Sequence, residues 1–184
     1  PRLGLKYELN KKQSFSFGAG LHSQVQPLYI YFATTNLGNG KVKETNRNLD
    51  FTKAAHIVLA YDINLFNSVR IKTEVYYQYL YKIPVKSRSD YFSAANLGAD
   101  FNSPNLDSLV SNGTGENYGF ELTLEKFYSK GYYFLITASL FESKYKGSDG
   151  VVRNTAFNGN YVFNALAGKE FKNGGKKVLP SSSP

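Results

Sequence analysis

The segment SVRIKTEVYYQYLYK, residues 68–82, alternates between two kinds of side chain. Most odd positions are apolar or aromatic, and most even positions are charged or polar. Successive side chains of a β-strand point to opposite faces of a sheet, so a period of two predicts a strand with one apolar face and one polar face.

Six further segments show the same alternation. Strands are therefore also predicted at 3–9, 14–22, 55–63, 118–124, 132–141 and from Tyr161 onward. Short turns join the two strands of each hairpin, and long polar segments follow the hairpins at about 23–52, 83–116 and 146–160. The predicted fold is all-β, with about seven up-and-down antiparallel strands and alternating short and long connections. Outer-membrane barrels have this pattern, with short periplasmic turns and long extracellular loops.

Two architectures can produce the alternation. In a soluble β-barrel or sandwich, the apolar face is the interior and the polar face meets water. In a membrane barrel, the apolar face meets lipid and the polar face lines a wet lumen. A small-ligand binding module of the soluble kind therefore remains the alternative at this point.

Three features favour the membrane barrel. The predicted strands exceed the typical soluble length of about five or six residues. Tyrosines gather near strand ends, as in an interfacial aromatic girdle, and glycines occupy several positions of the polar face. The expected lipid-facing residues are Val69, Ile71, Val75, Tyr77 and Tyr79. The expected lumen-facing residues are Arg70, Lys72, Glu74, Glu121 and Glu125.

In a membrane barrel, a shift in the pairing register of a strand would cost much free energy. A slip of one residue would place Arg70, Lys72 and Glu74 in hydrocarbon. Each Arg or Lys there costs about 2–4 kcal/mol at mid-depth, and Glu costs less.

The amino-acid composition limits the possible fold classes, kinds of site and partners. The 184 residues include 15 Tyr, 14 Phe and 16 Gly but no Cys, which favours β structure and excludes disulfides, cysteine-ligated zinc and a cysteine nucleophile. The sequence contains no run of about 18 apolar residues, so no transmembrane helix is predicted. The chain opens without a signal peptide, which indicates a cytoplasmic protein or an internal piece of a longer precursor. The net charge of +8 is scattered rather than gathered in a stripe, so no nucleic-acid partner is expected.

Candidate chemistry is sparse. His22 and His56 are predicted on the lumen face of different hairpins without a nearby histidine partner, so hydrogen bonding is favoured over metal binding. Glu121 and Glu125 share a face, and paired carboxylates can hydrolyse glycosides, but neighbouring lumen charges are the simpler explanation. We expect no enzymatic activity, no cofactor and no metal.

Ligand contacts are expected in the long loops, where aromatic rings can stack on a sugar or another planar ligand. The alternative role for these rings is to support the loop bases or to join the interfacial girdle. The candidates are Tyr29, Tyr31, Phe32, Tyr91, Phe92, Asp90, Asp100 and Asp107.

Several stretches resemble a known family. PRLGLKYELNKKQSFSFGAGLHSQVQPLYIYF resembles a strand–turn–strand–loop stretch in the barrel of TonB-dependent outer-membrane receptors. NYGFELTLEKFYSKGYYFLITASLFESKYKGSDG and RNTAFNGNYVFNALAGKEF resemble later parts of such barrels. The resemblance covers residues 1–172 and is strongest to receptors that carry a carboxypeptidase-regulatory-like domain before the plug.

The resemblance implies a plugged barrel of about 22 strands that takes up scarce nutrients. Its partners would be outer-membrane lipid, the plug domain, the remaining barrel strands, the nutrient and, through the plug, TonB. The sequence lacks a plug and a TonB-binding motif, so residues 1–172 are expected to form a partial barrel and residues 173–184 a non-strand tail or truncation. Such a piece is not expected to close alone, because its edge strands would be unpaired. The nutrient stays open among siderophores, vitamins, glycans and peptides.

Overall fold

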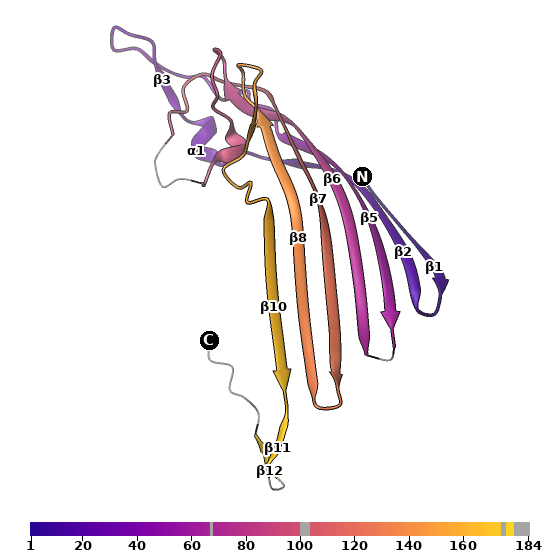
Figure 1. The fold of residues 1–184 in the computed structure, drawn as a ribbon. Coiled ribbons are helices and arrows are strands. Elements are labelled where there is room, and N and C mark those ends of the chain that lie inside the picture. The colour runs from indigo at the N-terminus through magenta and orange to yellow at the C-terminus, as the bar shows by residue number, and fades with distance from the viewer. Residues whose placement is uncertain (67, 100–103, 174–175, 179–184) are drawn as a thin grey trace.

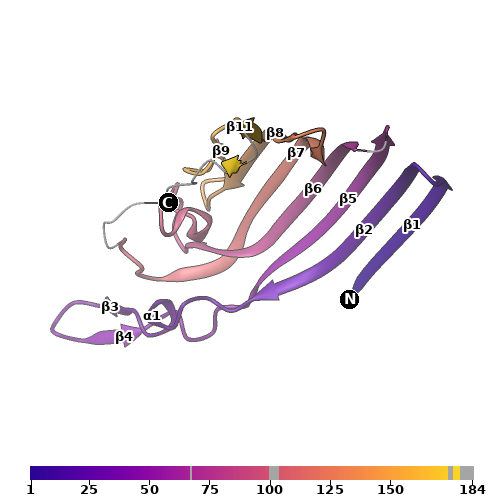
Figure 2. The same ribbon diagram turned by 90° about the horizontal axis from the view of Figure 1, so that it is seen from below.

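One long antiparallel sheet dominates the computed structural model, which describes residues 1–66, 68–99, 104–173 and 176–178. Neighbouring strands in the sheet follow chain order, and a short strand, β9 (Val152–Asn154), pairs with the end of β8. The sheet is bent into an open arc (Figure 2). Its strands are β1 (Arg2–Asn10), β2 (Gln13–Gln24), β5 (Thr52–Leu65), β6 (Val69–Lys86), β7 (Leu109–Ser129), β8 (Tyr132–Lys146) and β10 (Tyr161–Lys169).

The connections alternate in length as predicted. Short turns join β1 to β2, β5 to β6 and β7 to β8 at one end of the sheet, and the long loops lie at the other end (Figure 1). The loop after β2 contains α1 (Leu28–Tyr31), β3 (Thr34–Asn36) and β4 (Val42–Glu44), and the loop after β6 contains η1 (Ala94–Asn96). The expected antiparallel up-and-down fold is confirmed.

Strands β6 and β7 extend further toward the loops than the sequence predicted. The loop expected at 83–116 spans only 87–108, because the glycine- and asparagine-rich residues 109–117 belong to β7. Register shifts after Tyr81 and Ile83 bring this part of β7 close to β6. A Cβ on Gly113 would lie 2.5 Å from Val85 Cγ1, so glycine here permits a close strand approach rather than marking a loop.

The strand register sorts the side chains into two faces. One row across all seven strands is entirely apolar and defines the apolar face: Leu5, Phe17, Leu59, Val75, Phe120, Leu140 and Tyr161. A parallel row is entirely polar and defines the polar face: Glu8, Ser14, Asp62, Lys72, Thr123, Thr137 and Asn164. Leu5 and Leu140 are 59% and 60% exposed, so no part of the described chain forms a layer over the apolar face.

The main buried apolar cluster lies among the loops instead. Ile30 of α1 packs there with Leu49 and Leu109, and partly buried loop residues surround them. No helix among the described residues is long and apolar enough to cross a membrane. Within the segment 173–184, expected to be a non-strand tail, β12 (Lys176–Val178) pairs with β11 (Phe171–Asn173) in a separate small sheet, where Asn173 and Lys176 are register partners.

Candidate functional site

The polar face carries a cross-strand network of charges. Arg70 donates from Nε to Asp62 Oδ2 at 2.9 Å, and its Nη1 lies 3.7 Å from Glu125 Oε2. On the same strand, Lys72 Nζ lies 2.8 Å from Glu74 Oε2. The ten residues predicted to face lipid or lumen thus divide between the two faces, with the charged set on the polar face. Their contact with lipid or lumen stays a prediction.

Glu121 and Glu125 are not arranged as a glycosidase pair. They lie four residues apart on β7, which corresponds to about 13 Å along a strand. Catalytic carboxylate pairs are about 5–9.5 Å apart. Glu121 instead stands directly opposite Glu74 in the register, and Glu125 stands opposite Arg70.

A buried asparagine clamps the first long loop to the second. Asn46 is fully buried, and its Nδ2 donates to Ile30 O at 3.0 Å and Leu106 O at 2.7 Å. Its Oδ1 accepts from Leu109 N at 2.9 Å. One side chain therefore satisfies backbone groups from α1, from the second loop and from the start of β7.

The second and third long loops are also joined. Ser148 Oγ accepts from Asp90 N at 3.0 Å and donates to Arg88 O at 2.6 Å. Asn96 Oδ1 accepts from Ala156 N at 3.0 Å. In the third loop, hydrogen bonds from Arg153 hold the pKa of Asp149 below its usual value, so this carboxylate stays charged.

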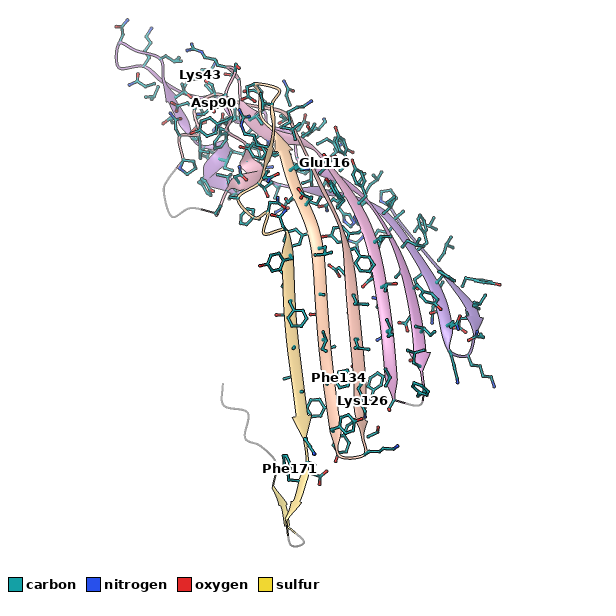
Figure 3. The ribbon with its side chains drawn as sticks, in the orientation of Figure 1. Lys43, Asp90, Glu116, Lys126, Phe134 and Phe171 are labelled. Atoms are coloured by element: carbon teal, nitrogen blue, oxygen red, sulfur yellow. The ribbon has the colours of Figure 1, made fainter. Side chains whose placement is uncertain are left out.

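These loops enclose a cavity of about 440 Å³, which we name the loop pocket. Figure 3 shows Asp90 at this end of the sheet. The pocket combines a cation, an acid, aromatic rings and amides, the mixture that fixes a small ligand by shape and a few polar contacts. Its lining includes Lys86, Asp90, Tyr91, Phe92, Asn96 and Tyr145.

Lys86 is the best-positioned polar group in the loop pocket. Its Nζ donates to Asn105 Oδ1 at 2.9 Å and to Asp107 O at 3.1 Å, and it lies 5.6 Å from the centre of the Phe92 ring. Burial lowers the pKa of Lys86, although Asp107 and Asp90 oppose that shift. The ammonium is thus oriented by neutral oxygens at the edge of the cavity.

Some of the residues predicted to contact a ligand line the loop pocket, and others lie elsewhere. Tyr91 and Phe92 line the loop pocket, as does Asp90. Asp107 contributes a backbone oxygen to Lys86, whereas Tyr31 packs against the buried loop cluster. Tyr29 and Phe32 are exposed and are not among the described residues that line the pocket. Asp100 lies outside the described residues.

Sequence reasoning missed Lys86, Asn96 and Tyr145 as pocket residues. Tyr145 belongs to the extension of β8 beyond the predicted end at 141, and Lys86 is the last residue of β6. The alternation is interrupted near both positions, so periodicity alone gave no signal for them.

The two histidines lie together, contrary to expectation. His22 and His56 stack with ring centroids 4.6 Å apart, because β2 pairs with β5 and only Gly20 stands opposite His56. A guanidinium nitrogen of Arg2 donates to His22 Nδ1 at 3.3 Å. No group of three or more metal-ligating side chains occurs in the described part of the chain.

At the short-turn end, a buried lysine holds the β7–β8 turn. Lys126 Nζ lies within 3.4 Å of four oxygens of residues 127, 129 and 132 and 3.9 Å from the centre of the Tyr132 ring. Figure 3 shows Lys126 and Phe134 at this end. The register places Lys126 on the apolar face, so its ammonium is turned back to the turn carbonyls.

We expect Lys126→Met to destabilise the folded protein by about 2 kcal/mol, because it removes a charged donor from the oxygens of residues 127, 129 and 132. Lys130→Met, at the exposed position of the same turn, is the control and should change stability by less than about 0.5 kcal/mol. Urea unfolding of the full-length protein in detergent micelles measures both. Equal midpoints for the two variants would show that Lys126 does not hold the turn.

Comparison with known proteins supports the fold. No family model matches the sequence. No curated protein matches it either. Among solved structures, the chain is similar to the FrpB iron transporter from Neisseria meningitidis (F3-3 variant), with a TM-score of 0.60 and 14% identity over 95% of this chain. It is also similar to the copper transporter OprC, with a TM-score of 0.57 and 13% identity over 94% of this chain.

In both comparisons, this chain matches the fold of only a part of the larger solved protein. The chain spans 24% of the length of each of the two solved structures. Its antiparallel sheet is similar to the walls of outer-membrane barrel transporters, the kind of fold expected from the resemblance to TonB-dependent receptors.

Proposed function

We propose that residues 1–172 form part of the barrel of an outer-membrane TonB-dependent receptor for nutrient uptake. The observation that carries this proposal is the set of uninterrupted rows, apolar on one face and polar on the other, across seven long strands. A wall between lipid and a wet lumen requires such a separation. The sequence resemblance supports the receptor type with a carboxypeptidase-regulatory-like domain before the plug.

The exposure of the apolar face supports this proposal over the soluble binding module. A soluble barrel would bury its apolar face in the interior. Here Val75 is 47% exposed and Leu140 60%, whereas the alternating positions of β6 on the polar face are less exposed. Lipid would cover the apolar side chains that no other part of the described chain covers.

In the full receptor, the polar face lines the lumen and meets the plug domain. Strands β1 and β10, at the two ends of the sheet, pair with the remaining barrel strands. TonB acts on this segment only through the plug. The chemical role of the segment is passive, and we propose that it is not an enzyme, in keeping with the wide spacing of Glu121 and Glu125.

The loop pocket is the proposed contact for the nutrient. It lies where the long loops meet, and its aromatic rings and Lys86 suit a planar or polar small molecule. Two structural neighbours are named as iron and copper transporters. The nutrient of this receptor is a siderophore, vitamin, glycan or peptide, and the loop pocket is where the choice among them would be made.

Location and topology are testable together, because the chain has no cysteine. Tyr91→Cys places a thiol in an exposed loop, and Lys11→Cys places one in a short turn. In the full-length receptor with any other cysteine replaced, a membrane-impermeant maleimide should label Tyr91→Cys in intact cells. Lys11→Cys should react only after the outer membrane is permeabilised.

Fractionation of the same cells provides the second measurement, and the receptor should be recovered with the outer membrane. Recovery in the soluble fraction, or equal labelling of both variants in intact cells, would overturn the proposal. Soluble recovery would instead support the binding module with an apolar interior.

A further inference from the structure

We propose that the apolar face carries a binding site for one anionic phospholipid of the outer leaflet. The site consists of an apolar groove for an acyl chain and a lysine cluster for the phosphate of the headgroup. This inference rests on the proposed function, because it takes the apolar face as the lipid-facing wall. It adds a specific lipid to the general lipid contact of a barrel.

The apolar groove forms where two alanines take the place of large side chains on the apolar face. Ala19 and Ala55 form its floor on β2 and β5, and Leu3, Ile57, Tyr77 and Tyr79 stand around them. The hollow measures about 410 Å³ and is almost entirely apolar. The register places these side chains on the same face as Leu59 and Val75, so the groove opens toward the lipid side.

A second hollow of about 190 Å³ lies beside the first across the sheet, because the row Ala55, Tyr79, Glu116, Lys144 runs through both. Tyr79 lines both hollows, so a single elongated molecule can occupy the two together. The second hollow has a mixed lining, with Lys144 and Lys146 of β8 and Glu116 of β7 beside aromatic and aliphatic side chains. Figure 3 shows Glu116 in the half of the sheet nearer the loops. The site is therefore apolar over β2 and β5 and carries two lysines over β8, where Lys146 lies one step nearer the loops than the row of Tyr79.

The lysines of the second hollow differ in their partners. Lys144 is held by Glu142, whose Oε2 lies 3.4 Å from its Nζ, and by the Tyr118 hydroxyl at 3.2 Å. Glu116 Oε2 accepts from the Tyr77 hydroxyl at 3.3 Å. Lys146 is exposed and forms no ion pair with any described residue.

A third lysine belongs to the same side. Lys53 stands in the row Lys53, Tyr81, Thr114, Lys146, one step beyond Tyr79 on the apolar face. It too forms no ion pair within the described chain. The uncompensated cations lie at the level of the tyrosine girdle, where lipid phosphates are found. A lipid satisfies both the groove and the cations, whereas a free phosphate would leave the groove empty.

The experiment measures lipid retention by the full-length receptor in detergent. The purified receptor is mixed with dioleoylphosphatidylglycerol or with neutral dioleoylphosphatidylcholine, and bound lipid is counted by native mass spectrometry. We expect one phosphatidylglycerol to be retained in preference to phosphatidylcholine. The double variant Lys53→Ala, Lys146→Ala should weaken this retention by about thirtyfold, because each cation near an anionic headgroup contributes a factor of about five.

Filling the groove tests the apolar half separately. Ala55→Leu should reduce retention of both lipids, whereas Ala138→Leu, in the middle of the same face, should leave it unchanged. The paired control for the lysines is Lys11→Ala, Lys12→Ala in the β1–β2 turn. Each variant is first checked for recovery in the outer-membrane fraction.

Several outcomes would overturn the inference. Equal retention of the two lipids would show that the lysines do not select an anionic headgroup. Equal effects of Ala55→Leu and Ala138→Leu would show that the groove does not hold an acyl chain. Either result, with the receptor in the outer membrane, leaves the proposed function intact. A receptor recovered in the soluble fraction would overturn both.

Discussion

Leu140→Lys is expected to prevent stable assembly of the barrel wall. Leu140 belongs to the apolar row and lies near the middle of β8, next to Phe120 and Tyr161. Lysine at mid-depth on a lipid-facing surface costs about 2–4 kcal/mol, a large part of the ~5–15 kcal/mol by which native proteins are stable. Guanidinium unfolding of the full-length receptor in phospholipid vesicles measures the loss.

The matched control is the neighbouring residue on the same strand. Ser139→Lys introduces the same charge on the polar face, directly opposite Glu121 in the register. We expect a change within about 0.5 kcal/mol, because a surface substitution in a wet lumen costs little. Equal losses for Leu140→Lys and Ser139→Lys would mean that both faces meet the same solvent, and the membrane wall would be wrong.

Asn46→Ala is expected to release the first long loop from the second. The alanine would leave two buried backbone groups, the oxygen of Ile30 and the amide of Leu109, and the partly buried oxygen of Leu106 without their partner. An unsatisfied buried group costs about 1–3 kcal/mol, so the clamp should lose about 3 kcal/mol or more. Hydrogen exchange in peptides covering 28–49 and 104–110 should accelerate by about two orders of magnitude.

The control for this prediction is Asn48→Ala. Asn48 is exposed two residues away and has no hydrogen bond within the described chain. Its substitution should leave exchange unchanged, and the peptides of β7 and β8 near the short turns should exchange alike in all variants. Unchanged exchange in Asn46→Ala would show that the buried asparagine does not hold the loops together.

Alternation in the sequence predicted the sheet because it is a local property. Residues 68–82 separate charged from apolar side chains without any information about their neighbours, and the structure pairs them in that register. The short turns were equally visible, because polar residues interrupt the alternation. The number and order of strands followed from these signals.

Local signals failed where the backbone departs from regular pleating. Gly113 and Gly115 indicated a loop, yet both belong to β7. At Gly113 the bulged end of β6 comes too close for a Cβ, and at Gly115 a Cβ would lie 3.0 Å from the Lys144 oxygen of β8. Lys82 has a φ of 58° at that bulge. The parity of side chains changes beyond such a point, so Lys86 could not be assigned to a face from periodicity.

By itself, the sequence determined the all-β class, the two chemically distinct faces and the alternation of short and long connections, since each depends on residues close together in the chain. Tertiary structure decided which distant residues meet. Strand pairing brought His22 beside His56, the burial of Asn46 joined residues 30, 106 and 109, and two alanines in adjacent rows opened the groove beside Tyr79. Such contacts depend on the register between strands and on packing between loops, which no local pattern encodes.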